Sequence, residues 1–446
     1  MFENMSRNEA KTKVLEAVQA YCKQFPCDYG SVFVDGGRVQ YAGHIFDHHE
    51  ISALVDCGLG YWLAGGKYTE QFESGLGEYL ELPYVSLVNS GSSANLIAFM
   101  ALTSHMLGDR AISRGDEVIT VAAGFPTTVS PIVQFGAVPV FVDITIPQYN
   151  IDVSMLDKAL SGKTKAVMLA HTLGNPFDVQ AVLDFCRKHN LWLVEDNCDA
   201  LGTKIRVDGK VRYTGGIGDI GTSSFYPPHH ITMGEGGAVY TKNELLHKII
   251  RSLRDWGRDC CCPPGQDNIC GQRFNQSHGN LPMGYDHKYV YSHFGYNLKA
   301  TDMQAAVGCE QLKKLASFVE KRKQNFNKLS TLLSDMGNCL ILPEPLPDSE
   351  PSWFGFLLTC KSGVERSKLV KHMESKNIQT RNLFAGNLLR HPCMTGLCEN
   401  VDYRIVGNLA NTDRAMQDTF WVGVYPGMSD KKIEYMAKMI KEGCGM

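Results

Sequence analysis

Two adjacent histidines, His229 and His230, follow two prolines within the stretch Ser-Ser-Phe-Tyr-Pro-Pro-His-His-Ile-Thr-Met-Gly-Glu-Gly-Gly, which spans residues 223–237. A proline ring fixes φ and removes a backbone donor, so this stretch should hold both imidazoles on a stiff, non-helical segment. Imidazole titrates near neutral pH, which suits it to acid–base catalysis. The alternative is a surface loop with two solvated histidines. On residue types alone the two interpretations carry equal weight.

A second candidate is the sequence Ser-Gly-Ser-Ser at 90–93, which lies between an expected strand at 84–88 and an expected helix. The first N–H groups of a helix lack partners and the helix dipole favours an anion, so such a segment can bind phosphate. Serine is also a common helix N-cap. Capping is therefore at least as good an explanation of these residues.

Asp196 and Phe125 each follow an apolar strand, at 191–195 and 117–122. A carboxylate at the end of a strand in an open sheet points into the ligand crevice. Asp196 could there hold a pyridinium proton, which makes pyridoxal phosphate an electron sink. Phe125 could stack on a planar cofactor. Taken singly, a structural ion pair or N-cap for Asp196 and a core position for Phe125 are the simpler interpretations.

Four of the 15 cysteines lie within eleven residues, at positions 260, 261, 262 and 270. In a long chain without secretory features, such clustering indicates metal binding or catalysis rather than disulfides. Thiolates bind zinc and iron–sulfur clusters. The Cys-x-Cys-x7-Cys spacing matches none of the common zinc patterns, and one remote cysteine would complete four ligands. Cys198, at the predicted crevice, is the candidate.

The chain has 446 residues, of which 44% are hydrophobic and 20% charged, and its formal net charge is −3. It therefore has no basic surplus that would favour nucleic acid or an acidic membrane. No apolar run approaches the roughly 20 residues that span a bilayer. The first residues, Met-Phe-Glu-Asn-Met-Ser-Arg, contain no apolar signal core, so a cytoplasmic protein is expected.

Short apolar segments alternate with helical patterns from Tyr84 onward. The expected strands are 84–88, 117–122, 138–142, 166–171, 191–195, 219–225 and 238–241, and the expected helices lie near 127–135, 153–160, 178–189 and 244–255. This alternation is typical of an α/β protein with a mainly parallel sheet covered by helices on both faces.

Three parts are predicted along the chain. Residues 1–80 form a helical N-terminal segment, with helices at 8–24 and 47–63, and residues 81–310 form a large domain. The large domain includes an irregular loop at 259–296, long enough to be functional or disordered. Residues 311–446 comprise a linking helix and a small α/β domain; one long helix or two are expected over 302–336.

Taken together, these segments resemble the fold-type-I, pyridoxal-phosphate-dependent sugar aminotransferase superfamily of the DegT type, over about residues 60–440. The similar features, in the family's order, are the Ser-Gly-Ser-Ser loop, the Glu195–Asp196 pair, Ser-Phe before the Gly-Glu-Gly-Gly turn, Gly295-Tyr-Asn297, and Gln304-Ala-Ala-Val-Gly308. The resemblance implies a large domain with a mainly parallel seven-stranded sheet and a smaller C-terminal α/β domain.

In that family a lysine four residues after Phe225 anchors the cofactor covalently, whereas this chain has His229. Imidazole cannot form a Schiff base, so the resemblance implies a poor aminotransferase. Asp255-Trp-Gly-Arg-Asp-Cys260, Gly284-Tyr-Asp-His-Lys-Tyr289 and Phe420-Trp-Val-Gly-Val-Tyr-Pro426 look like one branch of the family, the CDP-4-keto-6-deoxyglucose 3-dehydrases.

The resemblance to this branch implies two cofactors, pyridoxamine 5'-phosphate and a [2Fe–2S] cluster. The cluster ligands would be Cys198, Cys260, Cys262 and Cys270, while Cys261 has no role in the branch's pattern. His229 would be the catalytic base. The other implied roles are phosphate binding by Ser92, Ser93 and Ser224, pyridinium binding by Asp196, ring stacking by Phe125, and a contact from Asn297 to the phosphate in a neighbouring subunit, which requires a homodimer.

The activity implied is C3 deoxygenation of a nucleotide-linked 4-keto-6-deoxyhexose, with CDP as the nucleotide, in 3,6-dideoxyhexose and lipopolysaccharide O-antigen biosynthesis. Electrons would come from an NAD(P)H-dependent reductase that carries flavin and iron–sulfur groups. Three alternatives stay open: a cluster-free 3-dehydratase, the same chemistry on a GDP- or TDP-sugar, and a catalytically dead scaffold that senses iron or redox state.

Overall fold

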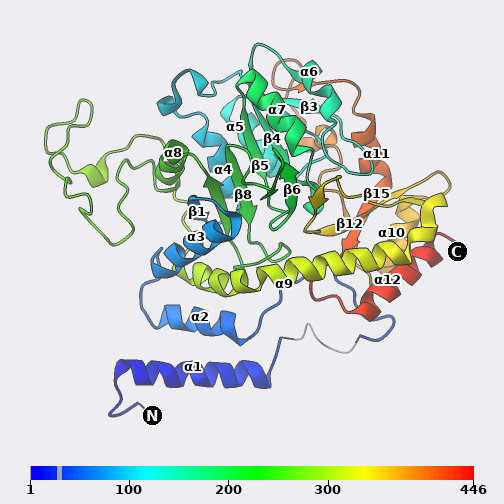
Figure 1. Ribbon diagram of the computed structural model, residues 1–446, viewed down its shortest axis with the longest axis horizontal. Helices are drawn as coiled ribbons and strands as arrows, with labels where there is room; N and C mark the ends of the chain where they lie inside the picture. Colours follow the sequence, from blue (N-terminus) through cyan, green and yellow to red (C-terminus); the bar gives the residue numbers. More distant parts are fainter. Residues whose placement is uncertain (1, 28–32, 446) are drawn as a thin grey trace.

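The computed structural model describes residues 2–27 and 33–445, and Figure 1 shows its arrangement. Within these residues, eight strands form the central sheet in the order β1-β9-β8-β5-β4-β2-β3-β14. The strands are β1 (Tyr84–Val88), β2 (Glu117–Val121), β3 (Val138–Val142), β4 (Thr164–Ala170), β5 (Trp192–Asp196), β8 (Ile220–Ser224), β9 (Gly237–Thr241) and β14 (Arg404–Ile405). The first seven match the strands expected from the sequence, and β14 extends the sheet by a short pair with β3.

All neighbouring strands from β8 to β14 are parallel, and β9 is antiparallel to both β1 and β8. The predicted α/β class with a mainly parallel sheet is therefore confirmed. Because parallel strands end at the same edge, the segments that follow β1, β2, β5 and β8 gather there. This edge carries the polar residues singled out from the sequence.

Helices cover both faces of the sheet, as Figure 1 shows. Side chains of a strand alternate between faces, and along β5 Trp192 and Val194 pack in a core with α4 and α8 while Leu193 packs in a core with α7. The helices are α4 (Gly91–Ala101), α5 (Pro126–Phe135), α6 (Leu156–Ala159), α7 (Val179–His189) and α8 (Glu244–Arg254). Two mainly apolar layers thus hold the sheet in place.

The N-terminal part contains α1 (Arg7–Gln24), α2 (His48–Gly58) and α3 (Lys67–Leu80). The first two were predicted, and the sequence analysis missed α3. Phe72, Leu76 and Leu80 of α3 share a core with Leu87 of β1. The end of the predicted N-terminal segment is therefore packed into the large domain.

Helix α9 (Asp302–Leu332) is continuous and links the large domain to the C-terminal part; in Figure 1 it runs across the view between the central sheet and α2. The predicted domain boundary at 310/311 falls inside this helix. A second sheet has the order β10-β12-β15-β13. Its elements and those around it are β10 (Leu340–Ile341), β12 (Gly355–Cys360), β13 (Arg381–Asn382), β15 (Thr419–Gly423), α10 (Arg366–Ser375), α11 (Ala410–Asp418) and α12 (Asp430–Gly443).

A third, small sheet of β6 (Lys204–Val207), β7 (Lys210–Tyr213) and β11 (Ser349–Glu350) connects the two parts. Residues 259–296 form the long irregular loop that the sequence predicted, with one short 3₁₀ turn at His287–Tyr289. It projects from the body beside α8, in green at the left of Figure 1. Among the described residues, the helices are too short or too polar to cross a bilayer.

Candidate active site

A cavity of about 480 Å³ lies at the carboxyl edge of the central sheet, where the small domain covers it. Its wall includes Ser92, Phe125, Asp196, Ser224 and His229 from the large domain. The small domain contributes Phe354, Arg381, Asn382, Phe384 and Trp421. The predicted metal ligand Cys198 also lines it, so the structure brings six of the predicted site residues to one place. Among the described residues that line this cavity there is no lysine.

Asp196 is buried at the end of β5 and held by a hydrogen-bond network. Its Oδ2 accepts from Asn95 Nδ2 and Thr128 Oγ1, each at 2.7 Å, and its Oδ1 accepts the backbone N–H of Cys198 at 3.2 Å. Thr222 Oγ1 donates to Asn95 Oδ1, which fixes the orientation of that amide. A carboxylate fixed in this way at the cavity wall can accept a hydrogen bond from a ring N–H of a ligand.

The neighbouring residue, Glu195, points to the other face of the sheet and is fully buried. It pairs with His171 Nε2 at 3.0 Å and accepts backbone N–H groups from the 215–218 turn. These partners lower the pKa of Glu195 against the effect of burial, which raises it. Of the Glu195–Asp196 pair, one carboxylate is structural and the other faces the cavity.

His229 lies at the cavity wall with its Nδ1 3.3 Å from Oδ1 of Asp199, an ion pair whenever the imidazole is protonated. Burial raises the pKa of Asp199, and His229 opposes that rise. The ring packs near Phe354, with 5.3 Å between centroids. The backbone carbonyl of His229 accepts from Arg322 Nη2 at 3.2 Å. Asp199 and Phe354 therefore orient the imidazole at the cavity wall, where it can exchange a proton with a ligand.

His230 is turned away from the cavity and is buried. Its Nε2 donates to the carbonyl of Ser352 at 2.8 Å. Burial, together with the charge of Arg322, lowers the pKa of His230 well below its usual value. The same burial lowers the pKa of Arg322 to about 9. The two adjacent histidines thus have separate surroundings, and His230 supports the segment that carries His229.

One serine of the Ser-Gly-Ser-Ser segment caps α4, whereas Ser92 and Ser224 line the cavity. Ser90 is the N-cap of α4: its Oγ accepts the N–H of Ser93 at 3.0 Å and donates to the Ser93 hydroxyl at the same distance. Ser92 and Ser224 line the cavity, whereas Ser93 does not. Gly91 lies so close to Ser224 and to the Cys198 sulfur that a Cβ there would overlap the Ser224 side chain. The arrangement fits an anion at the start of α4.

Phe125 is the residue before α5, and 50% of its surface is exposed, into the cavity. Its ring meets that of Phe384 edge-on, with 6.2 Å between centroids. A half-exposed aromatic ring in a cavity wall is available to stack on a planar ligand. The simpler core position considered for Phe125 is therefore wrong.

The four cysteines proposed as metal ligands do not meet within one chain. Cys198 lines the active-site cavity, whereas Cys260, Cys262 and Cys270 line a separate, small cavity in the 259–296 loop. Burial and the nearby Asp196 raise the pKa of the Cys198 thiol well above its usual value. Cys261 is exposed beside them. Of the four cysteines in the loop, three line this small cavity and the fourth, Cys261, does not.

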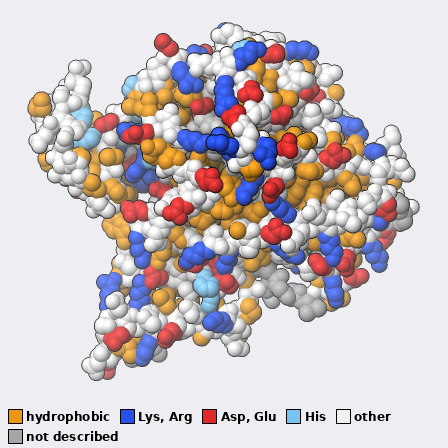
Figure 2. Space-filling model, viewed as in Figure 1, with side chains coloured by type: hydrophobic (Ala, Val, Ile, Leu, Met, Phe, Trp, Pro, Cys, Tyr) orange, Lys and Arg blue, Asp and Glu red, His pale blue; other side chains and the backbone are white. Residues whose placement is uncertain are grey.

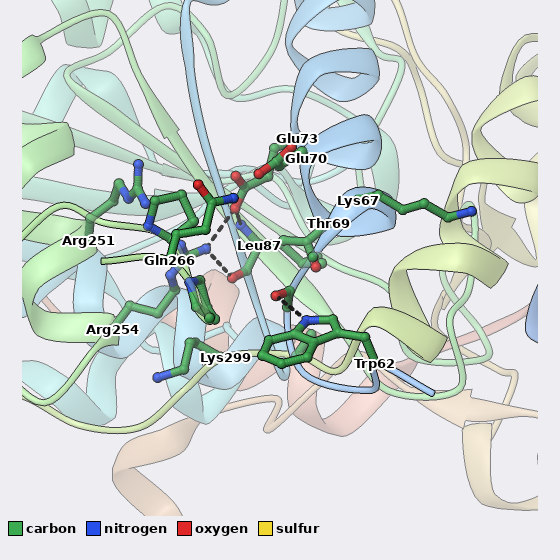
Figure 3. A pocket seen from close by; sticks show the side chains of 16 residues that line it. Trp62, Lys67, Thr69, Glu70, Glu73, Leu87, Arg251, Arg254, Gln266 and Lys299 are labelled. Carbon is green, nitrogen blue, oxygen red and sulfur yellow. Dashed lines mark hydrogen bonds and ion pairs between the residues drawn. The ribbon is translucent and has the colours of Figure 1, made fainter. Parts of the chain in front are cut away.

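Asn297 also lies outside the cavity and is exposed. It pairs with Asp255 in an isolated β-bridge at the base of the 259–296 loop. A second cavity, of about 400 Å³, lies between the start of α3, the end of α8 and Pro263–Gln266 (Figure 3). It holds the ion pair of Arg254 with Glu73, at 2.7 Å. None of the predicted site residues lines this second cavity.

Two residues of the cavity were missed by the sequence reasoning. Asp199 belongs to the quoted Glu-Asp-Asn-Cys-Asp run, three residues after Asp196, and that proximity was the available signal. Arg381 is the only arginine or lysine among the described lining residues, and its guanidinium lies over the Tyr41 ring at 3.9 Å. It comes from the small domain, 185 positions after Asp196, and its local sequence gave no signal.

The chain is similar to known proteins over most of its length. The chain is 51% identical over 445 residues to the lipopolysaccharide biosynthesis protein RfbH of Salmonella typhimurium, covering 99% of this chain and 100% of that protein. It is 47% identical over 437 residues to dTDP-4-dehydro-2,6-dideoxy-D-glucose 3-dehydratase of Saccharopolyspora spinosa, covering 97% and 92%.

Among solved structures, E. coli GDP-4-keto-6-deoxy-D-mannose-3-dehydratase with bound hydrated PLP aligns with a TM-score of 0.79 and 28% identity, over 90% of this chain and 99% of that one. The model of the DegT/DnrJ/EryC1/StrS aminotransferase family matches residues 45–441. With its sheet, its covered carboxyl edge and this match over most of its length, the chain belongs to the DegT/DnrJ/EryC1/StrS aminotransferase family.

Proposed function

We propose that this chain is a pyridoxamine-phosphate-dependent 3-dehydrase that removes the C3 hydroxyl of a nucleotide-linked 4-keto-6-deoxyhexose. The observation that carries the proposal is that a histidine backed by Asp199 stands in the cavity wall and no lysine lines that cavity in the described part of the chain. An aminotransferase of this fold needs an amine there. An imidazole cannot form a Schiff base, but it can transfer protons.

The residues of the cavity fit the cofactor. Asp196 would hold the ring nitrogen, Phe125 would stack on the ring, and Ser92 and Ser224 would hold the phosphate. When bound, pyridoxamine phosphate supplies an amine for the C4 ketone of the sugar and an electron sink for the carbon next to that amine. The hydrogen-bonded carboxylate of Asp196 would keep the ring nitrogen protonated, which is what makes the sink effective.

His229 would accept a proton from the cofactor's methylene carbon and then donate it to the departing C3 oxygen. Asp199 would stabilise the imidazolium between these two transfers, because its carboxylate lies 3.3 Å from Nδ1. Arg381 would bind a phosphate of the nucleotide, because it is the cation that the small domain brings to the cavity. Phe354 and Trp421 would exclude water from the reacting atoms.

We propose in addition a [2Fe–2S] cluster with Cys198, Cys260, Cys262 and Cys270 as ligands, which would supply single electrons. The exposed Cys261 has no assigned role. The electron donor would be an NAD(P)H-dependent reductase with flavin and iron–sulfur groups, and the enzyme would act as a homodimer in the cytoplasm. The proposed substrate is CDP-linked, in 3,6-dideoxyhexose biosynthesis of the lipopolysaccharide O antigen.

The names of two relatives support the proposed function. RfbH is named for lipopolysaccharide biosynthesis, and the S. spinosa relative is named as a 3-dehydratase of a dTDP-linked sugar. The second of these names makes a dTDP-sugar the first competitor to the CDP-sugar. A cluster-free 3-dehydratase is the second candidate function, because Cys198 and the loop thiols occupy different cavities of one chain.

The test is an anaerobic purification followed by absorption spectra with and without pyridoxamine phosphate, an iron and sulfide assay, and turnover with CDP-, dTDP- and GDP-linked 4-keto-6-deoxyhexoses. We expect bound cofactor that borohydride does not fix to the protein, and stoichiometric iron. A lysine adduct at this site would disprove the proposal. Absence of iron with retained dehydration would select the cluster-free candidate.

A further inference from the structure

The largest fully buried side chain among the described residues is a charged one, Arg322 of α9, which is 1% exposed. On the face of the molecule that Figure 2 shows, lysine and arginine side chains lie at the surface among carboxylates. Burial lowers the pKa of Arg322 to about 9, and the negative charge of Asp199 opposes that fall. Burying a cation costs free energy unless its donors find acceptors. The acceptors of this guanidinium therefore indicate its role.

The guanidinium of Arg322 joins two backbone segments that are distant in sequence. Its Nη2 donates to the carbonyl of His229 at 3.2 Å. Its Nη1 donates to the carbonyls of Trp353 at 3.2 Å and of Phe354 at 3.4 Å. The first acceptor follows β8 of the large domain, and the other two directly precede β12 of the small domain. One side chain thus ties the backbones of the two domains together.

Both of these segments contribute a side chain to the active-site cavity. His229 and Phe354 line it, and their rings pack together with 5.3 Å between centroids. The histidine therefore has its own backbone, and the backbone of the ring that it packs on, held by the same guanidinium. A shift of either segment would move the imidazole relative to a ligand in the cavity.

Two further contacts hold the same pair of segments. His230 Nε2 donates to the carbonyl of Ser352 at 2.8 Å. Phe326, about one helical turn after Arg322 on α9, stacks on Trp353 with 3.7 Å between ring centroids. A single hydrogen bond lets the joined groups rotate about it, whereas a second anchor beside it fixes their relative orientation. Arg322 supplies that second anchor.

We propose that Arg322 is a positioning residue for the 3-dehydration, because it clamps the segment of His229 to the segment of Phe354 and so keeps the imidazole directed at the substrate. The inference rests on the proposed function, since it takes His229 as the base. Arg322 does not line the cavity, so it acts through these two residues and not by touching a ligand. The planar fork of a guanidinium can reach acceptors on both segments, whereas the ammonium of a lysine is a compact point charge.

The test compares Arg322→Gln and Arg322→Lys with the matched control Arg404→Gln. Arg404 also joins distant segments, because it pairs with Glu117 and donates to the carbonyl of Ala159, but it lies outside the cavity. Single-turnover formation of the 3-deoxy product at saturating cofactor and substrate measures the reaction. Titration of pyridoxamine phosphate absorbance measures cofactor binding, and urea unfolding measures stability. Hydrogen exchange of the backbone amides, read by mass spectrometry of peptides, measures how firmly each segment is held.

Arg322→Gln should slow the single turnover by up to about 10²-fold, the effect of a misplacement of roughly 1 Å. Cofactor affinity should be unchanged, because the residues proposed to hold the cofactor keep their places. Amide exchange should become faster in peptides covering 226–230 and 352–356 and stay the same in the rest of the large domain. Arg322→Lys should recover part of the rate at most. Arg404→Gln should keep the wild-type rate and the wild-type exchange in both segments.

A wild-type rate in Arg322→Gln would overturn the inference. Equal losses of rate and of cofactor binding, with faster exchange throughout the protein, would also overturn it, because Arg322 would then only stabilise the fold. Full recovery of the rate in Arg322→Lys would contradict the clamp, since a point charge would suffice. If the glutamine variant does not fold, the lysine variant carries the same measurements, and a wild-type rate in it decides against the clamp.

Failure of the proposed function gives a different result. A wild type that removes the C3 hydroxyl from none of the nucleotide sugars would refute the proposed function and would leave the clamp to the amide exchange. Unchanged exchange at 226–230 and 352–356 in Arg322→Gln would then overturn the clamp as well. Faster exchange confined to these two segments would support it without any activity.

Discussion

Nδ1 of His229 lies 3.3 Å from Oδ1 of Asp199, and both side chains face the cavity that contains Asp196. Asp196 accepts hydrogen bonds from Asn95 and Thr128, which fix its carboxylate at the cavity wall. Asp199 is instead paired with His229. In the proposed function, the two carboxylates, three residues apart, would therefore serve two different groups, Asp196 the cofactor and Asp199 the imidazole of His229.

Replacing His229 with Asn should leave pyridoxamine phosphate binding in place and slow loss of the C3 hydroxyl by about 10²- to 10⁴-fold, the usual contribution of a general base. Single-turnover formation of the 3-deoxy product measures the step, and titration of cofactor absorbance measures binding. His372→Asn on α10 is the matched control, because that histidine lies outside the cavity. A His229→Asn enzyme with normal dehydration would move the base elsewhere.

Replacing Asp199 with Asn should slow the same step by about 10- to 100-fold, less than loss of the base itself, because His229 stays in place without its counter-charge. Burial raises the pKa of Asp199, so removing this charge should not destabilise the fold at neutral pH. Single-turnover formation of the 3-deoxy product measures the rate and urea unfolding measures the stability. An unchanged rate would contradict the pairing.

Replacing Gly91 with Ala should disturb the start of α4, because the new Cβ would overlap the Ser224 side chain. We expect a cost of about 1–3 kcal/mol in the free energy of unfolding, as for other overpacked sites, and weaker cofactor binding. The matched control is Gly58→Ala at the end of α2, where a Cβ meets nothing within 4 Å. Urea unfolding and cofactor titration measure both effects. Equal stability of the two variants would refute the close approach.

His230 should make the fold sensitive to acid. Burial lowers its pKa well below the usual value, so below pH of about 6.5 the unfolded chain binds a proton that the folded chain refuses. The free energy of unfolding should therefore fall as the pH drops, by up to about 1.4 kcal/mol per pH unit from this one residue.

His230→Gln keeps a donor for the Ser352 carbonyl and removes the titration, so its stability should fall less steeply between pH of about 7 and 5. Urea unfolding over this range measures the slopes. Some slope should remain, because burial lowers the pKa of His247 to about 4. Parallel slopes for the variant and the wild type would show that His230 is protonated in the folded state.

The elements around the site could be predicted because each rests on local pattern. Seven strands of the central sheet were expected from apolar runs, and Asp196 was expected at a strand end for the same reason. Helix α3 was missed although Phe72, Leu76 and Leu80 recur at helical spacing, because its interior contains two glycines, which disfavour a helix. Strand β14 is only two residues long, and its pairing with β3 depends on contacts distant in sequence.

The sequence by itself determined the α/β fold, the carboxylate at the end of β5, the histidine after Pro228 and the clustered thiols of the loop, because these follow from residue types and short spacings. Only the tertiary structure decided that His229 pairs with Asp199, that His230 bonds Ser352 instead, and that Cys198 lies in another cavity than Cys260 and Cys262. The reason is physical: a side chain's partners depend on which distant segments the packed layers bring beside it, and short spacings do not encode that.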